Sequence, residues 1–495
     1  MRIERIINRL IFKLSRNKFT FMLITLFFVF FAFSTFTMLD FNNDIDTSKT
    51  TALVVDGKAF GADVVIKIHS DVQLDDYQVK VPLNTNGITH IRFQTLDGQV
   101  LPYWIEHDEN GNPDGIVWIK TSLQPGDNYV LAYYDPSQSP DGDSVFEFFD
   151  DFDGTSLDTG KWDISQDLGN NWVISFSNSI LSLKYDGSES GEKYWEINSK
   201  RKFNSNYIFE TLQKGSWYGQ KLYGYFGFKN NVIIVDNTDE NGNNNGYQYT
   251  KVSSCSVGSN PSESGSEFHN YKIVWGSNYI NFYKDTLELS KNVCEYPTEE
   301  TTAFIRINNH KTLTNSNSRI WYFDYIFVRK YSSTEPSVTV FGSLSTSQDS
   351  KVLVTLPKQL EKFNQVKLTI DGSENIVSYF SNDCNNWIKI TSQDYVSVKE
   401  TNTFCYKAEI PLGSVLKSVD FETQYVEHDS PIASFASNLA LPKYNVKPQV
   451  SEIPFIATLS RLYFGFRTIL NNVWNFLSRP FTITYREVAY NETTY

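Results

Sequence analysis

Two short segments of the sequence carry alternating oxygen-bearing side chains of the kind that bind calcium. Residues 237–242 and residues 106–111 each place three such side chains at alternate positions before a glycine, as in the first half of a calcium-binding loop. The twelfth positions, where a closing glutamate would stand, are Gln248 and Val117. A polar hairpin loop without an ion is therefore the alternative at both places. The ligands predicted for a structural calcium in the first segment are Asn237, Asp239 and Asn241.

A group of aromatic residues lies just upstream and has a composition typical of a sugar-binding surface. These aromatics stand among Gly215, Gly219 and Gly224, so the sequence predicts loops that present rings to the C–H faces of a sugar. Packing of the same rings in a core is the alternative, because large aromatic side chains usually serve cores. The residues predicted to bind carbohydrate are Trp217, Tyr218, Tyr223 and Tyr225.

The elements that must position these residues are predicted to be β-strands. Aromatic residues make up 15% of the 495 residues, and short alternating apolar segments are separated by turns such as Asn86-Gly87 and Asp97-Gly98. We therefore expect an all-β chain of tandem sandwiches with a helix near each end. The expected division is 1–18 (basic amphipathic segment), 19–39 (transmembrane anchor), 40–51 (tether), 52–147 (first sandwich), 148–334 (jelly roll), 335–430 (small sandwich) and 431–495 (C-terminal segment).

Residues 53–342 resemble two known kinds of β-domain. Asp151-Phe-Asp-Gly154, Leu157-Asp158 and Trp162 are similar to the opening strand of concanavalin-like jelly rolls, the fold of laminin-G-type lectins and laminarinase-type glycosidases. Upstream, Tyr77–Leu83 and Leu101–Glu106, with further strands, resemble an uncharacterised sandwich that is common in exported archaeal and bacterial proteins and often precedes such a jelly roll.

This resemblance implies both a metal site and a test for catalysis. Concanavalin-like folds often hold a structural calcium near the opening strand, which makes Asp151 and Asp153 candidate ligands. The laminarinase-type enzymes carry a Glu-x-Asp-x-(x)-Glu pattern on one strand, since glycoside hydrolysis needs two placed carboxylates. No such triplet occurs here, and the strand expected at that position is the apolar segment 232–235. We therefore expect binding without catalysis.

The N-terminus carries signals for a membrane. Residues 1–18 have a net charge of +5 on an amphipathic pattern, and the uncharged residues 19–39 would span roughly 31 Å as a helix. The positive flank predicts that the remainder lies outside the cytoplasm. A cleaved signal peptide with a site at Ala32-Phe33-Ser34 is the alternative.

Charge and cysteine content fit an extracytoplasmic location. The net charge is −13, which leaves −18 for residues 19–495 and argues against a nucleic-acid partner. The cysteines fall into two local pairs, and two disulfides are the favoured interpretation, with four free thiols as the alternative. The pairs are Cys255 with Cys294 and Cys384 with Cys405.

Near the C-terminus, apolar residues at helical spacing predict an amphipathic helix over about 455–478, ending before Pro480. Its wide apolar side suits a membrane surface or a partner helix, and packing on its own third domain is the alternative.

Taken together, these patterns favour a membrane-anchored extracytoplasmic protein that binds a glycan or a surface protein, with calcium as a structural ion. A structural protein of a cell envelope or archaeal virus particle, assembled as a homo-oligomer, is one alternative. A divergent glycan hydrolase is the other.

Overall fold

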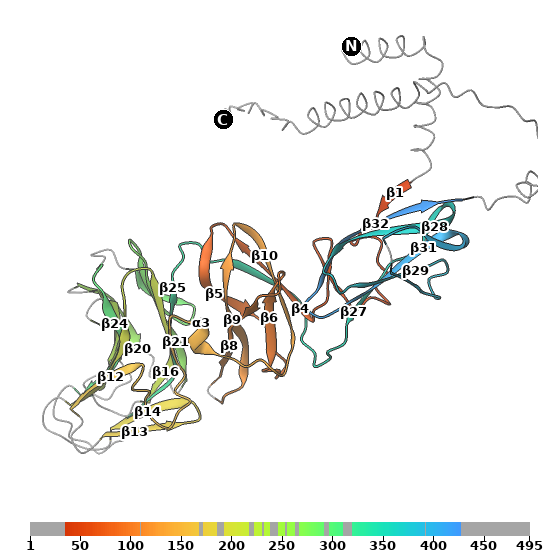
Figure 1. Cartoon of the computed structure of the whole chain (residues 1–495). Helices are drawn as coiled ribbons and strands as arrows, with labels where there is room; N and C mark the ends of the chain where they lie inside the picture. Colours follow the sequence, from red (N-terminus) through yellow and green to blue (C-terminus); the bar gives the residue numbers. More distant parts are fainter. Residues whose placement is uncertain are drawn as a thin grey trace, which may run out of the picture. The chain divides into compact units, whose positions relative to one another are not determined.

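The computed structural model describes residues 35–108, 110–167, 172–185, 193–216, 222–229, 232–237, 246–252, 255–262, 267–291, 297–309, 319–391 and 393–426. These residues form β-sheets almost throughout (Figure 1), which confirms the all-β prediction. The single helix among them is the short α3 (Gly142–Val145), which begins after the capping side chain of Asp141.

Two antiparallel sheets face each other in the jelly roll. One has the strand order β13 (Trp172–Ser177), β14 (Ile180–Tyr185), β25 (Arg319–Lys330), β16 (Tyr207–Ser216), β21 (His269–Trp275), β22 (Ile280–Lys284) and β23 (Leu287–Lys291), with β11 (Phe148–Asp150) paired to β25. The other has the order β12 (Trp162–Asp167), β15 (Tyr194–Phe203), β24 (Thr301–Asn309), β17 (Leu222–Phe228), β18 (Val232–Asn237), β19 (Gly246–Val252) and β20 (Cys255–Ser262).

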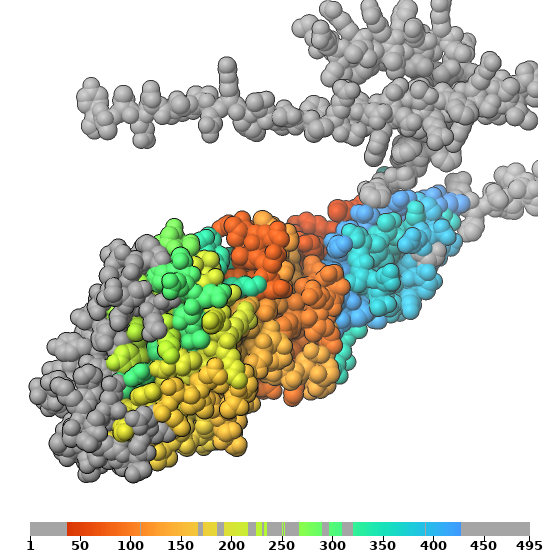
Figure 2. Space-filling view, turned by 60° about the vertical axis from the view of Figure 1, so that its left-hand side comes forward, coloured from red at the N-terminus to blue at the C-terminus, as the bar shows by residue number. Residues whose placement is uncertain are grey.

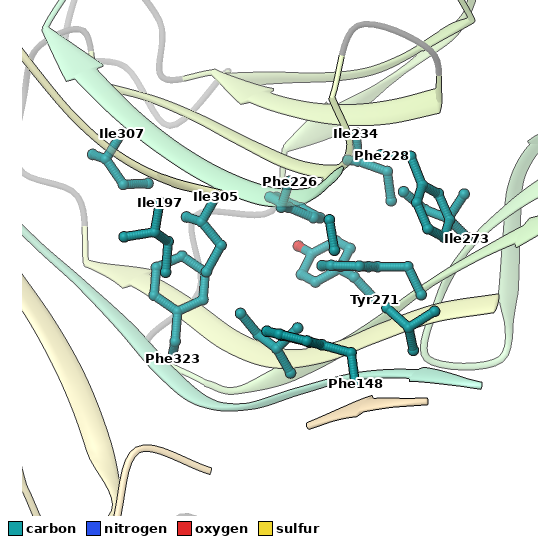
Figure 3. Packing of buried hydrophobic residues seen from close by; sticks show 14 of the residues in the cluster. Phe148, Ile197, Phe226, Phe228, Ile234, Tyr271, Ile273, Ile305, Ile307 and Phe323 are labelled. Atoms are coloured by element: carbon teal, nitrogen blue, oxygen red, sulfur yellow. The ribbon is translucent and has the colours of Figure 1, made fainter. Parts of the chain in front are cut away.

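The core of the jelly roll fills the space between these sheets. Alternate residues of each strand point inward, so Phe226 and Ile305 of the seven-stranded sheet meet Tyr271 and Phe323 of the eight-stranded sheet (Figure 3). Gly224 allows the sheets to approach, because a Cβ atom there would lie 2.2 Å from the indole ring of Trp321. The remaining alternate residues must then face away from this core.

A second, smaller sandwich also consists of two sheets. The five-stranded sheet has the order β26 (Ser337–Gly342), β4 (Val64–Ser70), β10 (Gly126–Tyr134), β6 (Ile91–Thr95) and β7 (Val100–Leu101). The three-stranded sheet has the order β5 (Leu74–Pro82), β9 (Pro113–Leu123) and β8 (Tyr103–His107). We call this sandwich the middle domain.

The third sandwich, the outer domain, is built from both ends of the described chain. Its main path is β2 (Leu53–Val55), β3 (Lys58–Phe60), β32 (Val415–Gln424), β28 (Lys358–Gly372), β31 (Val396–Ile410), β29 (Val377–Ser381) and β30 (Ile388–Ile390). In addition, β1 (Thr35–Met38) pairs with β32, and β27 (Lys351–Val354) pairs with β31.

The three domains are therefore nested rather than consecutive. Residues 35–60 complete the outer domain, and β26 returns to complete the middle domain by pairing with β4 (Figure 1). In Figure 2 the red residues near the start of the described chain lie against the blue residues near its end. The expected boundaries at 51/52 and 334/335 are wrong in this respect, since β2, β3 and β26 each belong to a different sandwich from the one predicted.

The expected anchor and tether must also be shortened. The structure places Thr35–Met38 in strand β1, and it buries Leu39 and Phe41 in the core of the outer domain. Leu39 and Phe41 are thus covered by protein, whereas Met38 at the end of β1 is 59% exposed. Residues 1–34 and 427–495, with the predicted anchor helix and amphipathic helix, lie outside the described residues. Within the described part of the chain, no helix is long and apolar enough to cross a membrane.

Aromatic packing and a buried ion pair join the jelly roll to the middle domain. Trp104 and Trp118 of the middle domain pack against Tyr325 and Phe327 on the outward face of β25. Beside them the buried Arg329 donates from Nε to Glu210 (2.9 Å) and from Nη1 to Glu335 (2.9 Å). Glu335 in turn accepts a 2.8 Å hydrogen bond from the hydroxyl of Tyr77.

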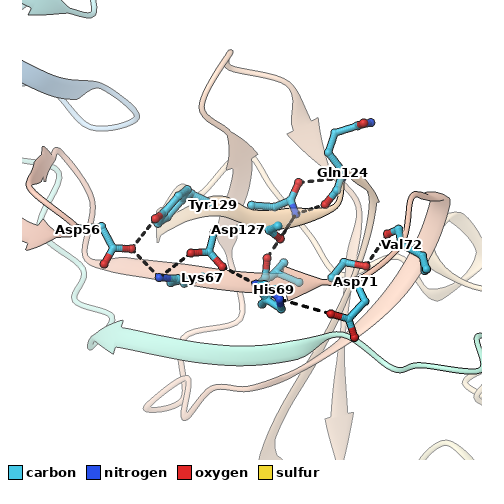
Figure 4. A network of polar contacts seen from close by, with 12 residues as sticks. Asp56, Lys67, His69, Asp71, Val72, Gln124, Asp127 and Tyr129 are labelled. Carbon is cyan, nitrogen blue, oxygen red and sulfur yellow. Dashed lines mark hydrogen bonds and ion pairs between the residues drawn. The ribbon is translucent and has the colours of Figure 1, made fainter. Parts of the chain in front are cut away.

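A charged network crosses from the outer to the middle domain (Figure 4). Lys67 of β4 lies 2.8 Å from Asp56, in the turn between β2 and β3, and 2.8 Å from Asp127 of β10. Hydrogen bonds to Asp127 and Asp56 raise the pKa of Lys67 above its ordinary value, so the lysine stays charged. Asp127 also accepts from His69 Nδ1 at 2.7 Å. The network is exposed and serves as a link between domains.

Candidate functional site

The outward face of the seven-stranded sheet gathers the polar and aromatic side chains that face away from the jelly-roll core. On β15, Trp195 and Ile197 point into the core, so Tyr194, Glu196 and Asn198 point outward. The same alternation on β24 turns Phe304, Arg306 and Asn308 outward between core residues. We call this surface the seven-stranded face.

The strand register pairs these positions with positions of the neighbouring strands, in rows across the sheet. One row pairs Ser165, Glu196, Arg306, Tyr225, Val235 and Tyr249 in successive strands. The adjacent row pairs Asp167, Tyr194, Asn308, Tyr223, Asn237 and Tyr247. Tyrosine and asparagine positions thus alternate along the second row, while the first row brings a carboxylate and a guanidinium together.

Glu196 is held by three donors at the centre of the first row. Lys229 Nζ donates to Oε1 at 2.6 Å, Asn198 Nδ2 donates to Oε1 at 2.9 Å, and Arg306 Nη1 donates to Oε2 at 3.4 Å. Burial acts to raise the pKa of Glu196, but the hydrogen bonds and the two cations outweigh it and hold the pKa below its ordinary value. This carboxylate is therefore ionised at neutral pH and cannot act as a proton donor.

Aromatic groups flank this ionic centre on both sides. The guanidinium of Arg306 lies 4.3 Å from the centre of the Tyr194 ring, whose hydroxyl is 3.4 Å from Ser165 Oγ. In the neighbouring strands Tyr225 packs against Ile233 and Phe304 and remains half-exposed. Glu196 itself is 5% exposed, so the groups that this face presents to solvent are the Lys229 ammonium, the Arg306 guanidinium and the half-exposed rings of Tyr194 and Tyr225. Such rings and cations can stack on a sugar ring and hydrogen-bond its hydroxyls.

The predicted carbohydrate residues fall partly on this face. Tyr225 lies on the seven-stranded face, and Tyr223 occupies the second row, paired with Asn237. Trp217 and Tyr218 lie outside the described residues, as do Asp239 and Asn241. The structure thus brings Tyr223 and Tyr225 onto one strand beside one predicted calcium ligand, and sugar binding remains a prediction.

The other predicted calcium sites have different surroundings. Burial, together with the charges of Asp153 and Asp150, raises the pKa of Asp151 to about 6. In the segment 106–111, Asp108 Oδ1 accepts backbone N–H bonds from Asn110 (2.9 Å) and Asn112 (2.8 Å), as expected for the hairpin alternative. In the part of the chain that the structure describes, no group of three or more His, Cys, Asp or Glu residues is arranged to hold a metal ion. Calcium stays a prediction.

One predicted disulfide is present. Cys384 and Cys405 are bonded, with a Cα–Cα distance of 5.4 Å, and they join the turn after β29 to β31. For the other pair, Cys255 begins strand β20, whereas Cys294 lies outside the described residues.

Sequence reasoning missed the ionic centre of the face. Glu196, Lys229 and Arg306 come from three separate segments, and only the pairing of β15 with β24 brings them together. A signal was present in the alternation Trp195-Glu196-Ile197 and Ile305-Arg306-Ile307, where a charged residue is fixed between two inward apolar residues.

Parts of this chain are similar to known proteins. A protein-family model described as a domain of unknown function (DUF2341) matches residues 88–165, which covers most of the middle domain's strands after β5 and the start of the jelly roll. No curated protein matches the chain.

Solved structures of several other proteins are similar to part of this chain. They include a beta-1,3-glucanase from Mycobacterium marinum, with 12% identity and a TM-score of 0.30 over 37% of this chain and 98% of that chain. LamAcat from Zobellia galactanivorans has 14% identity and a TM-score of 0.31 over 37% and 97% of the two chains. A protein from work on endo-acting O-glycanases of the human gut microbiota has 17% identity and a TM-score of 0.30 over 38% and 100%. At this identity the likeness concerns the jelly-roll fold alone.

Proposed function

We propose that this protein recognises a glycan through the seven-stranded face and does not cleave it. The observation that carries the proposal is the centre of that face, where Glu196 is fixed by Lys229, Arg306 and Asn198 between Tyr194 and Tyr225. Such a centre offers directional hydrogen-bond groups beside aromatic rings. The sequence has no Glu-x-Asp-x-(x)-Glu pattern of the laminarinase-type enzymes, which supports binding without cleavage.

The protein is further proposed to act outside the cytoplasm at a membrane. The basic residues 1–18 and the apolar residues that follow support this location, as does the disulfide between Cys384 and Cys405. N-terminal sequencing of the protein from its membrane fraction distinguishes an uncleaved anchor from a signal peptide cut near Ala32-Phe33-Ser34.

The binding proposal is tested with the full-length chain on an array of neutral and acidic glycans. Tyr225→Ala and Arg306→Ala are expected to weaken binding of the preferred glycan by about tenfold or more, because each removes a partner worth ~1–2 kcal/mol. Tyr379→Ala is the matched control, because Tyr379 is a half-buried strand tyrosine of the outer domain. Its binding should equal that of the unmodified protein.

Two results would contradict the proposal. Binding that is equally strong in the Tyr225→Ala, Arg306→Ala and control variants would remove the seven-stranded face as the site. New reducing ends released from the bound glycan would show hydrolysis, and the divergent-hydrolase alternative would then replace non-catalytic binding.

A further inference from the structure

A pocket of about 550 Å³ opens on the other sheet of the jelly roll, on its outward side. This volume lies within the range of roughly 300–1,000 Å³ that is usual for small-ligand sites. Its lining comes from β21, β22 and the segment that leads from β25 to β26, and it includes Lys272, Asn278, Tyr279, Tyr283, Tyr331 and Glu335. Ile280 and Phe282 of β22 point into the core, which turns Tyr279, Asn281 and Tyr283 toward the pocket side of the sheet.

A buried amide fixes two of the tyrosine hydroxyls. Asn281 is 1% exposed, and its Nδ2 lies 2.7 Å from the hydroxyl of Tyr279 and 2.9 Å from that of Tyr283. The same nitrogen lies 2.7 Å from Glu288 Oε2. The two hydroxyl oxygens are 3.3 Å apart, a separation that suits the two oxygens of a vicinal diol. Burial, the Tyr283 hydroxyl and nearby carboxylates raise the pKa of Tyr279, which keeps its hydroxyl protonated.

The aromatic walls of the pocket are also ordered by their neighbours. The rings of Tyr279 and Tyr331 are nearly parallel, at an interplanar angle of 19° with their centres 6.4 Å apart. Lys272 Nζ lies 4.5 Å above the ring of Tyr283. Rings, hydroxyls and an ammonium group therefore converge on one cavity, which is the combination that binds a sugar ring by stacking and by hydrogen bonds.

The remaining wall is anchored at the junction with the middle domain. Glu335 is held by Arg329 Nη1 at 2.9 Å and by the Tyr77 hydroxyl at 2.8 Å. These contacts engage both of its carboxylate oxygens and fix the orientation of the carboxylate. Because the junction already fixes the segment from Tyr331 to Glu335, the segment would lose little conformational entropy when a ligand binds.

We infer that this pocket is a second glycan subsite, which takes a neutral pyranose residue through its vicinal hydroxyls. The inference rests on the proposed function for its ligand class, but it uses no residue of the seven-stranded face. The two sites lie on opposite sheets of one jelly roll, so the chain could bind two glycan ends, or two points of one branched glycan.

The test measures the number of sites and their affinities on the full-length chain. Cellotetraose, laminaritetraose and mannotetraose are titrated as neutral probes, with a hyaluronan tetrasaccharide as the acidic comparator. Tyr331→Ala removes one wall, whereas Tyr283→Phe deletes only a hydroxyl and keeps the packing ring. For a neutral probe we expect two sites per chain, with one weakened about tenfold by Tyr331→Ala and several-fold by Tyr283→Phe.

The variants separate this inference from the proposed function. If Tyr225→Ala weakens one site while Tyr283→Phe and Tyr331→Ala change nothing, the pocket inference fails and the proposed function stands. If the pocket variants abolish all binding and Tyr225→Ala changes nothing, the pocket stands and the seven-stranded face fails. Preference for the hyaluronan probe at the pocket would overturn the neutral ligand class.

Discussion

Glu106 offers a direct test of the junction between the middle domain and the jelly roll. It is 4% exposed, accepts a 2.6 Å hydrogen bond from Trp118 Nε1, and has Lys80 Nζ at 3.3 Å. Burial raises its pKa to about 7, against an ordinary value of 4.5. The substitution Glu106→Gln keeps the acceptor for Trp118 and removes the charge.

The expected effect depends on pH. Because the pKa of Glu106 is higher in the folded state than in the unfolded state, protonation of Glu106 stabilises the fold. This stabilisation is fully present below about pH 4.5 and is lost as the pH rises through 7. The difference between the folded-state and unfolded-state pKa values, at about 1.36 kcal/mol per pH unit, corresponds to about 3 kcal/mol of unfolding free energy. Glu106→Gln should therefore match the unmodified protein near pH 4.5 and exceed its unfolding free energy by up to about 3 kcal/mol at pH 8.

The assay is urea unfolding followed by tryptophan fluorescence at pH 4.5, 6 and 8. The chain has ten tryptophans, of which Trp118 donates a hydrogen bond to Glu106, so the fluorescence signal follows unfolding of the domains together. Glu374→Gln is the control, since Glu374 is exposed and the substitution should shift the transition little at any of these pH values. A Glu106→Gln variant that is destabilised equally at pH 4.5 and pH 8 would refute the reasoning, because it would mean that the effect of the substitution does not depend on the ionisation of the carboxylate.

Three further predictions concern stability. Arg329→Met should lower the unfolding free energy by roughly 3–5 kcal/mol, because it leaves Glu210 buried without its cation. Arg329→Met combined with Glu210→Gln should lower it by less. Chemical unfolding of the single and the double variant measures both values. Deleting residues 1–34 should leave the outer domain stable. Deleting residues 1–41 should lower its unfolding free energy by about 3–6 kcal/mol, because Leu39 and Phe41 are lost from its core. Limited proteolysis compares the two forms, and equal cleavage rates would show that residues 35–41 do not stabilise the domain. Cys405→Ser should lower the unfolding free energy by about 3 kcal/mol, as expected for a disulfide that joins residues with a sequence separation of 21. Reduction of the unmodified protein should lower it by a similar amount. Equal melting temperatures before and after reduction would contradict this prediction.

The features that were predictable from sequence depend on local pattern. The alternation in Ile320–Val328 predicts a strand, and β25 contains it. Cys384 and Cys405 are close in the chain, so their pairing needed no knowledge of the fold. Tyr225 was named as a candidate because tyrosines and glycines cluster within a few residues of it, and its role in sugar binding stays a prediction.

The features that were missed depend on pairing between distant segments. Nothing near Thr35 indicates that its partner is Thr423, and the apolar residues around it fit a membrane helix as well as a buried strand. Glu196 and Arg306 are separated by 110 residues and meet only through the strand register. The pocket tyrosines likewise come from β22 and from the segment after β25. Strand existence is encoded locally, whereas sheet order is not.

The nested order of the domains has a mechanical consequence. Because β1 runs antiparallel to β32, with Thr35 opposite Thr423, the two ends of the described chain leave the outer domain at the same edge. Tension applied between these ends peels β1 from β32 one hydrogen bond at a time, a geometry that yields at low load. The middle domain is pulled only after the outer domain opens, and the jelly roll, enclosed by both, is stretched last. Under tension the outer domain would thus unfold first, and the two sheets of the jelly roll would keep their structure until both other domains had opened.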